Sequence, residues 1–200
     1  MKIYICENYK TAKWRRKILR DEKVSLAFAK LCVCDYIGEK LSRIEFAFSK
    51  NKYGKPFISS LHKKKVGRIN RNVCYSLSHS GDILICAVSR YNIGADCQII
   101  NISDAQNCRK IAERFYSSEE NQALSALDGA DYIDKFFKIW TMKEAYIKYT
   151  GKGLAEGLTT FSVYSPGDVY FKRVRTRLPV YIYLCCGREN TDILGVKYII

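Results

Sequence analysis

The segment Ile93-Gly94-Ala95-Asp96-Cys97-Gln98-Ile99 carries oxygen ligands at the spacing of a β-strand. In a strand, Asp96 and Gln98 project from one face, whereas Cys97 projects from the other. Mg²⁺ prefers oxygen ligands, usually one or two carboxylates together with substrate phosphates. A carboxylate and an amide oxygen on one rigid strand could therefore reach a single ion. The polar outer face of an edge strand would give the same pattern, and the segment alone does not decide between the two.

A second candidate lies on a predicted helix at residues 131–149, which Gly151 ends. Glu144 and Lys148 continue the apolar stripe that passes through Trp140. A carboxylate on the core side of a helix has to be paired, hydrogen-bonded or bound to a metal, because burying it alone is costly. The alternative is a Glu–Lys pair near the helix end, worth roughly a few tenths of a kcal/mol. We favour a metal site, because the glycine places the helix end beside backbone that a ligand could approach.

The third candidate is the turn Ser78-His79-Ser80-Gly81. Hydroxyls, an imidazole and a glycine at a tight turn can contact phosphate oxygens. Ordinary hairpin chemistry explains the serines and the glycine equally well. Only His79 is unexpected, because histidine is not a favoured turn residue. From the residues alone, a structural and a functional role for His79 both stay open.

The elements that would position these candidates follow from hydrophobic periodicity and turn residues. A capping box is predicted at Ser117 and Glu120. Tyr75-Ser76-Leu77 and Phe161-Ser162-Val163 echo each other at an offset of 86 residues, which suggests two similar α+β lobes. The predicted elements are an edge strand at 1–6, a helix at 11–37, a basic loop at 61–72, a hairpin at 73–88, a strand at 91–99, and helices at 104–127 (interrupted around 115–118) and 131–149.

The composition is that of a globular chain with an uneven positive charge. Hydrophobic residues make up 48% of the 200 residues, and no apolar run approaches the ~20 residues that span a bilayer. The start turns polar at Glu7, too soon for a signal peptide, so we expect a cytoplasmic protein. Residues 1–100 carry 20 basic and 8 acidic residues, against 14 and 12 in residues 101–200. Such a field can attract nucleic acid, an anionic membrane, an acidic protein or a polyphosphate.

Nine cysteines and two histidines show no zinc-site spacing, and we expect reduced, buried thiols.

The candidates stand in a familiar order. Trp-x-x-Lys-Glu-Ala-x-x-Lys is the specific motif, and the Ser-His-Ser-Gly turn lies upstream of it. Together they closely resemble the 4′-phosphopantetheinyl transferases, specifically the larger, monomeric surfactin-synthetase type. In chain order the motifs are Gly54-Lys55-Pro56-Phe57, Tyr75-Ser76-Leu77-Ser78-His79-Ser80-Gly81, Ile93-Gly94-Ala95-Asp96, Trp140-Thr141-Met142-Lys143-Glu144-Ala145-Tyr146-Ile147-Lys148 and Gly151-Lys152-Gly153-Leu154.

The resemblance implies an α+β fold of two similar lobes related by a pseudo-twofold, with the ligand cleft between them. Residues 1–100 would form a basic N-terminal lobe on the coenzyme A phosphate side. Residues 101–200 would form a C-terminal lobe with the metal-site helix and the carrier-protein side. The implied reaction is transfer of 4′-phosphopantetheine from coenzyme A to a serine of an apo carrier protein, dependent on Mg²⁺, with release of 3′,5′-ADP.

The resemblance also implies roles for single residues. It places Lys55 and Pro56 near the adenine end of coenzyme A, and Ser78 and His79 at its phosphates. Asp96 and Glu144 match metal ligands, with Gln98 beside them. Glu144 matches the general base, and Lys148 matches a lysine that contacts the pyrophosphate; with His79, these form the expected catalytic set. Glu120 falls near another acidic position of the family. Candidates for the 3′-phosphate contacts are Lys10, Lys13, Arg15 and Arg16.

One position departs from the family. Gln98 stands where the family commonly has a glutamate, which removes one negative charge from the metal site, so we expect weaker Mg²⁺ binding. We expect a monomer acting on acyl or peptidyl carrier proteins of secondary metabolism, with neither nucleic acid nor membrane as a partner. The competing readings are a catalytically weak or dead relative that only binds coenzyme A, and a basic nucleic-acid-binding module.

Overall fold

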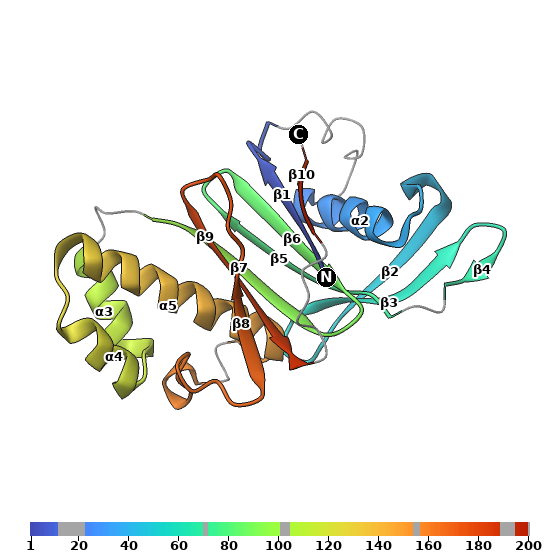
Figure 1. Cartoon of the computed structure of the whole chain (residues 1–200). Helices are drawn as coiled ribbons and strands as arrows, with labels where there is room; N and C mark the ends of the chain where they lie inside the picture. Colours follow the sequence, from blue (N-terminus) through green and yellow to red (C-terminus); the bar gives the residue numbers. More distant parts are fainter. Residues whose placement is uncertain (12–22, 70–71, 101–104, 154–156, 189–194, 200) are drawn as a thin grey trace.

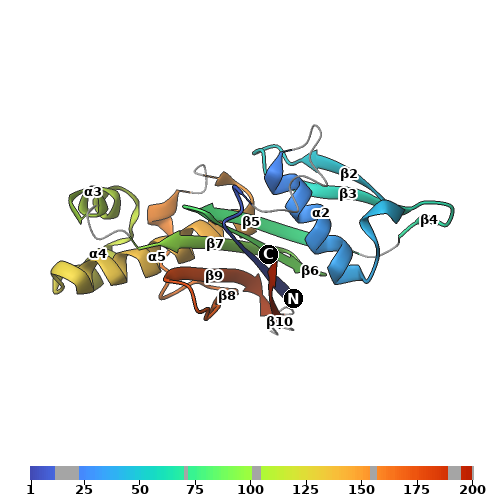
Figure 2. The ribbon, with the colours of Figure 1, turned by 90° about the horizontal axis from the view of Figure 1, so that it is seen from above.

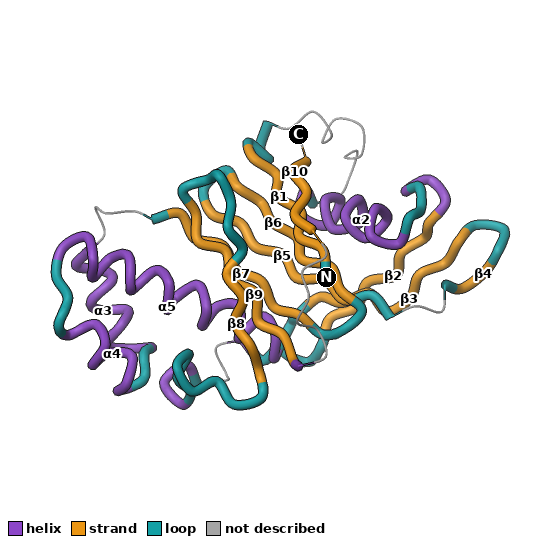
Figure 3. The backbone as a smooth tube through the Cα atoms, viewed as in Figure 1, coloured by secondary structure: helices purple, strands orange, loops and turns teal. Residues whose placement is uncertain are grey.

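The computed structural model describes residues 1–11, 23–69, 72–100, 105–153, 157–188 and 195–199 (Figure 1). The described strands form three sheets, which helices accompany (Figure 3). The strands are β1 (Lys2–Glu7), β2 (Ile44–Lys50), β3 (Pro56–Lys63), β4 (Gly67–Arg68), β5 (Cys74–Ser80), β6 (Ile83–Ser89), β7 (Ile93–Ile99), β8 (Val169–Arg173), β9 (Val180–Gly187) and β10 (Gly195–Ile199). The helices are α2 (Val24–Ile37), α3 (Ala105–Phe115), α4 (Ser118–Ser125) and α5 (Gly129–Thr150), with short 3₁₀ turns η1 (Leu41–Arg43) and η4 (Leu158–Thr160).

The first sheet has the strand order β10-β1-β6-β5. β1 pairs in parallel with β10, with Ile3 opposite Val196, and antiparallel with β6, with Ile3 opposite Ala87. The prediction of an edge strand at residues 1–6 was therefore wrong. The alternating pattern shows that a strand forms, but it does not show that a strand from the far end of the chain covers its edge.

The second sheet has the order β7-β9-β8, with all pairs antiparallel. β7 thus belongs to a sheet built with residues beyond 168, and β10 belongs to the first sheet. Each of these two strands therefore lies in a sheet whose other strands come from the opposite side of the expected boundary at residue 100. The α+β class is confirmed, whereas the pseudo-twofold and the lobe boundary stay predictions.

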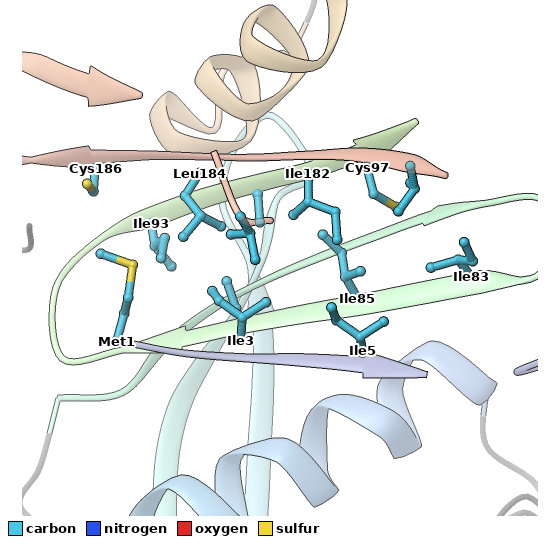
Figure 4. Close-up of a cluster of buried hydrophobic side chains, with 14 residues drawn as sticks. Met1, Ile3, Ile5, Ile83, Ile85, Ile93, Cys97, Ile182, Leu184 and Cys186 are labelled. Carbon is cyan, nitrogen blue, oxygen red and sulfur yellow. The ribbon is translucent and has the colours of Figure 1, made fainter. Parts of the chain in front are cut away.

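The two sheets pack face to face, and each carries a helix on its outer side. Ile3, Ile5 and Ile85 of the first sheet face Ile182 and Leu184 of the second across the core (Figure 4). α2 covers the far face of the first sheet, and α5 lies against β7 and β9 (Figure 2). All nine cysteines are reduced thiols, and eight of them are buried as predicted, whereas Cys74 is only partly buried.

The third sheet, β2-β3-β4, extends away from the rest of the chain beyond α2 (Figure 1). The basic loop predicted at residues 61–72 was wrong in part. β3 continues to Lys63 because Leu61 is buried in the α2 core, and Lys63 forms an ion pair with Glu39 at 2.6 Å. None of the described helices has the length and apolar character needed to cross a membrane.

α5 approaches β7 closely because Gly94 has no side chain. A Cβ atom at Gly94 would lie 1.9 Å from the carbonyl oxygen of Ala145 and 2.4 Å from the backbone nitrogen of Tyr149. Any larger residue would push the helix off the strand. The last two turns of α5 therefore lie directly on the strand that carries Asp96.

A fully buried ion pair fixes the other side of α5. Lys143 Nζ lies 2.7 Å from Glu120 Oε2, and it also donates to the carbonyl oxygens of Leu158 (2.6 Å) and Phe161 (3.1 Å). Glu120 accepts from the backbone nitrogens of Ser117 and Val163, both at 2.8 Å. The predicted capping box of α4 is confirmed. Glu120 therefore joins α4, α5 and the segment before β8.

Asp35 ties α2 to both neighbouring strands of the first sheet. Its carboxylate accepts from Tyr4 Oη of β1 at 2.8 Å, and it pairs with Lys197 of β10 and with Lys2. Burial alone would raise the pKa of Asp35, but hydrogen bonds from Lys197 and Tyr4 and the nearby lysine charges outweigh it. The pKa of Asp35 therefore lies below its ordinary value.

Breaking the Glu120–Lys143 pair should destabilise the fold strongly. Lys143→Met leaves the Glu120 charge buried without a cation, and we expect it to cost about 3–5 kcal/mol of unfolding free energy. Adding Glu120→Gln removes that charge and should recover a large part of the loss. The control is Lys138→Met at the partly exposed Lys138–Asp134 pair, with an expected cost of about 0.5 kcal/mol. Urea unfolding measures all four proteins; equal losses in the single and double variants would contradict the prediction.

The Asp35 contacts predict a pH-dependent contribution to stability. A lowered pKa stabilises the folded state above the unfolded carboxyl pKa of about 3.9, and this stabilisation is lost as the pH falls through the lower, folded-state pKa. We expect Asp35→Asn to cost about 1 kcal/mol at neutral pH. The difference from the wild type should shrink below about pH 4. Denaturant unfolding across this range tests it, and a difference that grows in acid would show the sign to be wrong.

Candidate functional site

In the described chain, β5 and β7 belong to different sheets, and serine hydroxyls of β5 join them through hydrogen bonds. Ser76 Oγ accepts from the backbone nitrogen of Ala95 at 2.9 Å, and Ser80 Oγ accepts from that of Ile99 at 3.0 Å. Ser76, Ser78 and Ser80 share one face of β5, because side chains alternate along a strand. The middle serine meets a carboxylate instead of a backbone group.

Asp96 is that carboxylate, and it is almost completely buried between the strands. Its Oδ1 accepts from Ser78 Oγ at 2.6 Å and from Lys148 Nζ at 2.7 Å. Its Oδ2 accepts from Gln98 Nε2 at 3.1 Å. The prediction that Asp96 and Gln98 share a face is confirmed, since Ala95 and Cys97 lie in the core between the sheets. Three donors from β5, β7 and α5 therefore hold one buried charge.

Glu144 lies one turn before Lys148 on α5 and faces the same site. Burial raises the pKa of Glu144, and the negative charge of Asp96 raises it further, whereas Lys148 lowers it. The two carboxylates are thus close enough to repel each other electrostatically. Lys143, the preceding residue, is fully buried in its ion pair with Glu120. α5 therefore buries further residues besides Ile133 and Phe136 of the predicted stripe.

The donor set of the site fits a hard cation such as Mg²⁺. Asp96 and Glu144 supply two carboxylates, and Gln98 can supply an amide oxygen. In the described ranges, no three His, Cys, Asp or Glu side chains gather into a metal-binding cluster. Further ligands for an ion would come from water or from substrate oxygens, as is usual for Mg²⁺.

A cavity of about 300 Å³ opens beside Lys148. Its walls come from the Tyr53–Pro56 segment, from the middle of β5 and from the C-terminal end of α5. Lys55, Pro56 and Lys148 all line it, so the structure brings these three predicted residues to one cavity. Gly151 ends α5 in the left-handed conformation (φ 68°), as predicted, and also lines the cavity.

The ammonium group of Lys55 is engaged at the end of α5. It donates to Asn92 Oδ1 and to the carbonyl oxygen of Tyr149, both at 3.2 Å. Burial lowers the pKa of Lys55. Asn92 Nδ2 donates to the same Tyr149 carbonyl at 2.8 Å, and Asn51 Nδ2 donates to the Gly151 carbonyl at 2.8 Å. Neither asparagine was predicted from the sequence, although Asn92 directly precedes the Ile93–Asp96 motif and Asn51 lies three residues before Gly54.

Side chains alternate along β5, so His79 lies on the face of the strand that points away from Asp96. Its side chain is exposed, and the centroid of its ring lies 6.1 Å from the centroid of the Tyr9 ring. Lys10 follows Tyr9, and its backbone nitrogen donates to Asp82 Oδ1 at 3.1 Å. Ser78 and His79 thus face opposite sides of the strand, and their phosphate contacts stay predictions. Lys13, Arg15 and Arg16 lie outside the described residues.

Several known proteins similar to this chain are 4′-phosphopantetheinyl transferases. A family model described as the 4′-phosphopantetheinyl transferase superfamily matches residues 92–185, which include β7 and α5. 4′-Phosphopantetheinyl transferase Sfp of Bacillus subtilis (strain 168) is 34% identical over 145 residues, 72% of this chain and 59% of the relative. 4′-Phosphopantetheinyl transferase gsp of Aneurinibacillus migulanus is 33% identical over 114 residues, 57% of this chain and 42% of the relative.

A further relative is matched over more of its length. 4′-Phosphopantetheinyl transferase ffp of Bacillus subtilis is 32% identical over 178 residues, 88% of this chain and 72% of the relative. The chain spans about half the length of the two relatives above. The long match to ffp, together with the family model over the site, shows that the chain belongs to the 4′-phosphopantetheinyl transferase superfamily.

Proposed function

We propose that the chain transfers the 4′-phosphopantetheine group of coenzyme A to a serine hydroxyl of an apo carrier protein, with Mg²⁺, and releases 3′,5′-ADP. The observation that carries this proposal is the convergence of Asp96 and Glu144 beside Lys148, which lines the cavity. Residues 48 positions apart meet there because Gly94 lets α5 rest on β7. Family membership supports the same reaction.

Asp96, Glu144 and Gln98 would hold the metal ion through oxygen atoms. When bound, Mg²⁺ would neutralise charge on the diphosphate and on the departing 3′,5′-ADP. Lys148 places a positive charge beside Asp96. Its ammonium sits on a flexible stem, so it can turn from the carboxylate to a diphosphate oxygen at the cavity. Lys55 and Pro56 would form the wall next to the adenine end.

Glu144 is the proposed general base. It lies beside Asp96 and Lys148 at the site, where a carboxylate can accept a proton directly or through water. Glu144 would take the proton of the carrier serine as the serine oxygen bonds to the phosphorus nearer the pantetheine. The bond from that phosphorus to the bridging oxygen breaks, and 3′,5′-ADP leaves. His79, with Tyr9 and Lys10 nearby, would contact phosphate from the other face of β5.

The expected partners follow from the charge distribution and the family. The basic first half would attract the phosphates of coenzyme A and an acidic acyl or peptidyl carrier protein. Residues 1–100 would form the coenzyme A phosphate lobe, and residues 101–200 the metal-site and carrier-protein lobe. We propose a cytoplasmic monomer that serves secondary metabolism, without nucleic acid or membrane partners.

A relative that binds coenzyme A without transferring its arm is the second candidate. Gln98 favours it, because its amide donates to Asp96 where a glutamate would add a second negative charge. Intact mass spectrometry of an apo carrier protein incubated with the chain, coenzyme A and Mg²⁺ separates the two functions. Only a transferase adds the mass of the arm. RNA retention without coenzyme A affinity would instead indicate the basic nucleic-acid-binding module.

Removing the proposed base should slow transfer without unfolding the chain. We expect Glu144→Gln to lower kcat by about 10²–10⁴-fold, because general base catalysis typically contributes that much. Glu119→Gln on exposed α4 surface is the matched control and should leave kcat unchanged. Mass gain of the carrier protein gives the rate, and the melting temperature checks folding. A folded Glu144→Gln protein with more than a tenth of the wild-type rate would exclude Glu144 as the base.

Restoring a carboxylate at position 98 should strengthen metal binding. In Gln98→Glu the added negative charge favours Mg²⁺, and we expect the half-saturating Mg²⁺ concentration of transfer to fall roughly tenfold. Without metal, the variant should melt at a lower temperature, because Asp96 then faces another carboxylate and loses the Gln98 donor. Mg²⁺ titration at fixed coenzyme A compares the two proteins. Equal metal dependence would show that residue 98 lies outside the metal shell.

A further inference from the structure

We propose that Asn51 is a positioning residue that holds the cavity beside Lys148 in the shape that binds the nucleotide end of coenzyme A. The inference rests on the proposed function, since it takes the Tyr53–Pro56 segment as the wall next to the adenine. Its basis is that one side chain binds both this segment and the end of α5, which form two walls of the cavity. Asn51 would thus act through the cavity walls and not on the substrate.

Asn51 builds the turn between β2 and β3 that forms the first of these walls. Its backbone nitrogen donates to the carbonyl oxygen of Lys55 at 3.0 Å, and its carbonyl oxygen accepts from the nitrogen of Gly54 at 2.9 Å. Its side-chain Oδ1 accepts from the backbone nitrogens of Tyr53 at 3.0 Å and Lys55 at 2.9 Å. Asparagine and aspartate both favour such turns, because their side-chain oxygen can bind nearby backbone groups. The turn alone therefore does not require an amide at this position.

The amide nitrogen of Asn51 adds a contact with the second wall. Nδ2 donates to the carbonyl oxygen of Gly151 at 2.8 Å, across 100 positions of the sequence. Gly151 ends α5, and carbonyl groups at a helix end have no partner within the helix. The two walls meet here, since a Cβ atom at Gly151 would lie 2.9 Å from Asn51 Nδ2 and 2.7 Å from Lys55 Cδ. The hydrogen bond therefore fixes the separation of the turn and the helix end at this point.

Asn51 lies behind the wall that would face the substrate. Lys55 and Pro56 line the cavity beside Lys148, and they also line a second cavity of about 280 Å³. In the described part of the chain, Asn51 lines the second cavity but not the first. A side chain in this place can affect a ligand in the first cavity only by holding or moving the wall.

Lys55 and Asn92 also contact the end of α5, but neither replaces Asn51. Lys55 Nζ reaches the Tyr149 carbonyl through a flexible stem, which leaves the backbone of the turn free to move. Asn92 donates to the same carbonyl, but it precedes β7 and is not part of the turn. Of these three side chains, Asn51 is the one that ties the backbone of the turn to the helix end.

Two variants keep an acceptor for the turn and lose the contact with α5. In Asn51→Asp, the carboxylate can still accept from the turn, but at neutral pH it has no proton to donate to Gly151. In Asn51→Ser, the hydroxyl can accept in the turn more weakly, and the shorter side chain does not reach Gly151. The second variant is uncharged, so equal effects in the two exclude repulsion between the new carboxylate and a phosphate.

We expect both variants to raise the KM for coenzyme A about tenfold, which is roughly the effect of one lost hydrogen bond. Their kcat should stay at the wild-type value, because a wall that binds ground and transition states alike affects KM alone. α5 keeps its place through Gly94 and the Lys143 ion pair, so the KM for the carrier protein should also stay the same. Mass gain of the carrier protein gives these constants.

Binding of 3′,5′-ADP gives a readout that does not depend on transfer. This nucleotide has the adenine end of coenzyme A without the pantetheine arm. Calorimetry in the absence of metal should show its affinity falling about tenfold in both variants, in step with the rise in KM.

Asn121→Ala is the matched control. Asn121 Nδ2 donates to the carbonyl oxygens of Ala112 and Tyr116 at the end of α3, both at 3.3 Å, and none of these residues lines the cavity. Its loss should lower the melting temperature and leave the KM for coenzyme A and the 3′,5′-ADP affinity unchanged. A purely structural role of Asn51 would give this same result.

Several results would overturn the proposal. Wild-type KM and 3′,5′-ADP affinity in both variants would reduce Asn51 to a turn residue, and the proposed transfer would still stand. An effect in Asn51→Asp alone would assign it to the added charge, and a lower kcat at unchanged KM would place the effect at the carboxylates. A wild-type chain that adds no arm to a carrier protein would overturn the proposed function, whereas weaker 3′,5′-ADP binding in both variants would still support the role of Asn51. A wild-type chain that binds neither nucleotide would overturn both.

Discussion

The buried charge of Asp96 is the constraint around which the rest of the site is arranged. A carboxylate between two packed sheets is stable only when donors replace the water it has lost. Ser78 from the first sheet, Gln98 from its own strand and Lys148 from α5 provide them. Each donor comes from a different direction, so the charge fixes β5, β7 and α5 relative to one another. The same arrangement leaves Glu144 facing Asp96. The two negative charges repel each other, and a divalent cation could relieve that repulsion.

Three sets of contacts fix the position of α5, and none of them involves Asp96 or Glu144. Gly94 allows the helix backbone to rest on β7, because a side chain there would collide with Ala145. Lys143 fixes the opposite side through its ion pair with Glu120. Lys55 and two asparagines hold the carbonyl groups at the helix end. A helix held along one side, on the other side and at its end has little freedom left, so Glu144 keeps its place beside Asp96. Lys148 is in addition held directly by its ion pair with Asp96.

Local features of the chain were predictable, whereas pairings across the sequence were not. The hairpin, the interrupted helix and the helix that ends at Gly151 follow from periodicity and turn residues, because these signals lie within a few neighbours. The face shared by Asp96 and Gln98 follows from strand alternation in the same way. The edge assignment of residues 1–6 failed because β10 is distant in sequence. The burial of Glu120 with Lys143 also depends on contacts between separate helices, so the family motif places Lys143 without explaining it.

Two lysines of one helix show how surroundings separate a structural from a functional role. Lys143 is fully buried, and its three donors meet three acceptors, so moving it would leave the ammonium unsatisfied and the buried Glu120 charge without a cation. Lys148 has 27% of its side chain exposed and lines the cavity. One carboxylate oxygen binds it, and Ser78 shares that oxygen, so Asp96 keeps a donor if Lys148 departs. The first lysine is therefore fixed, and the second is the one that can exchange a protein carboxylate for a substrate phosphate.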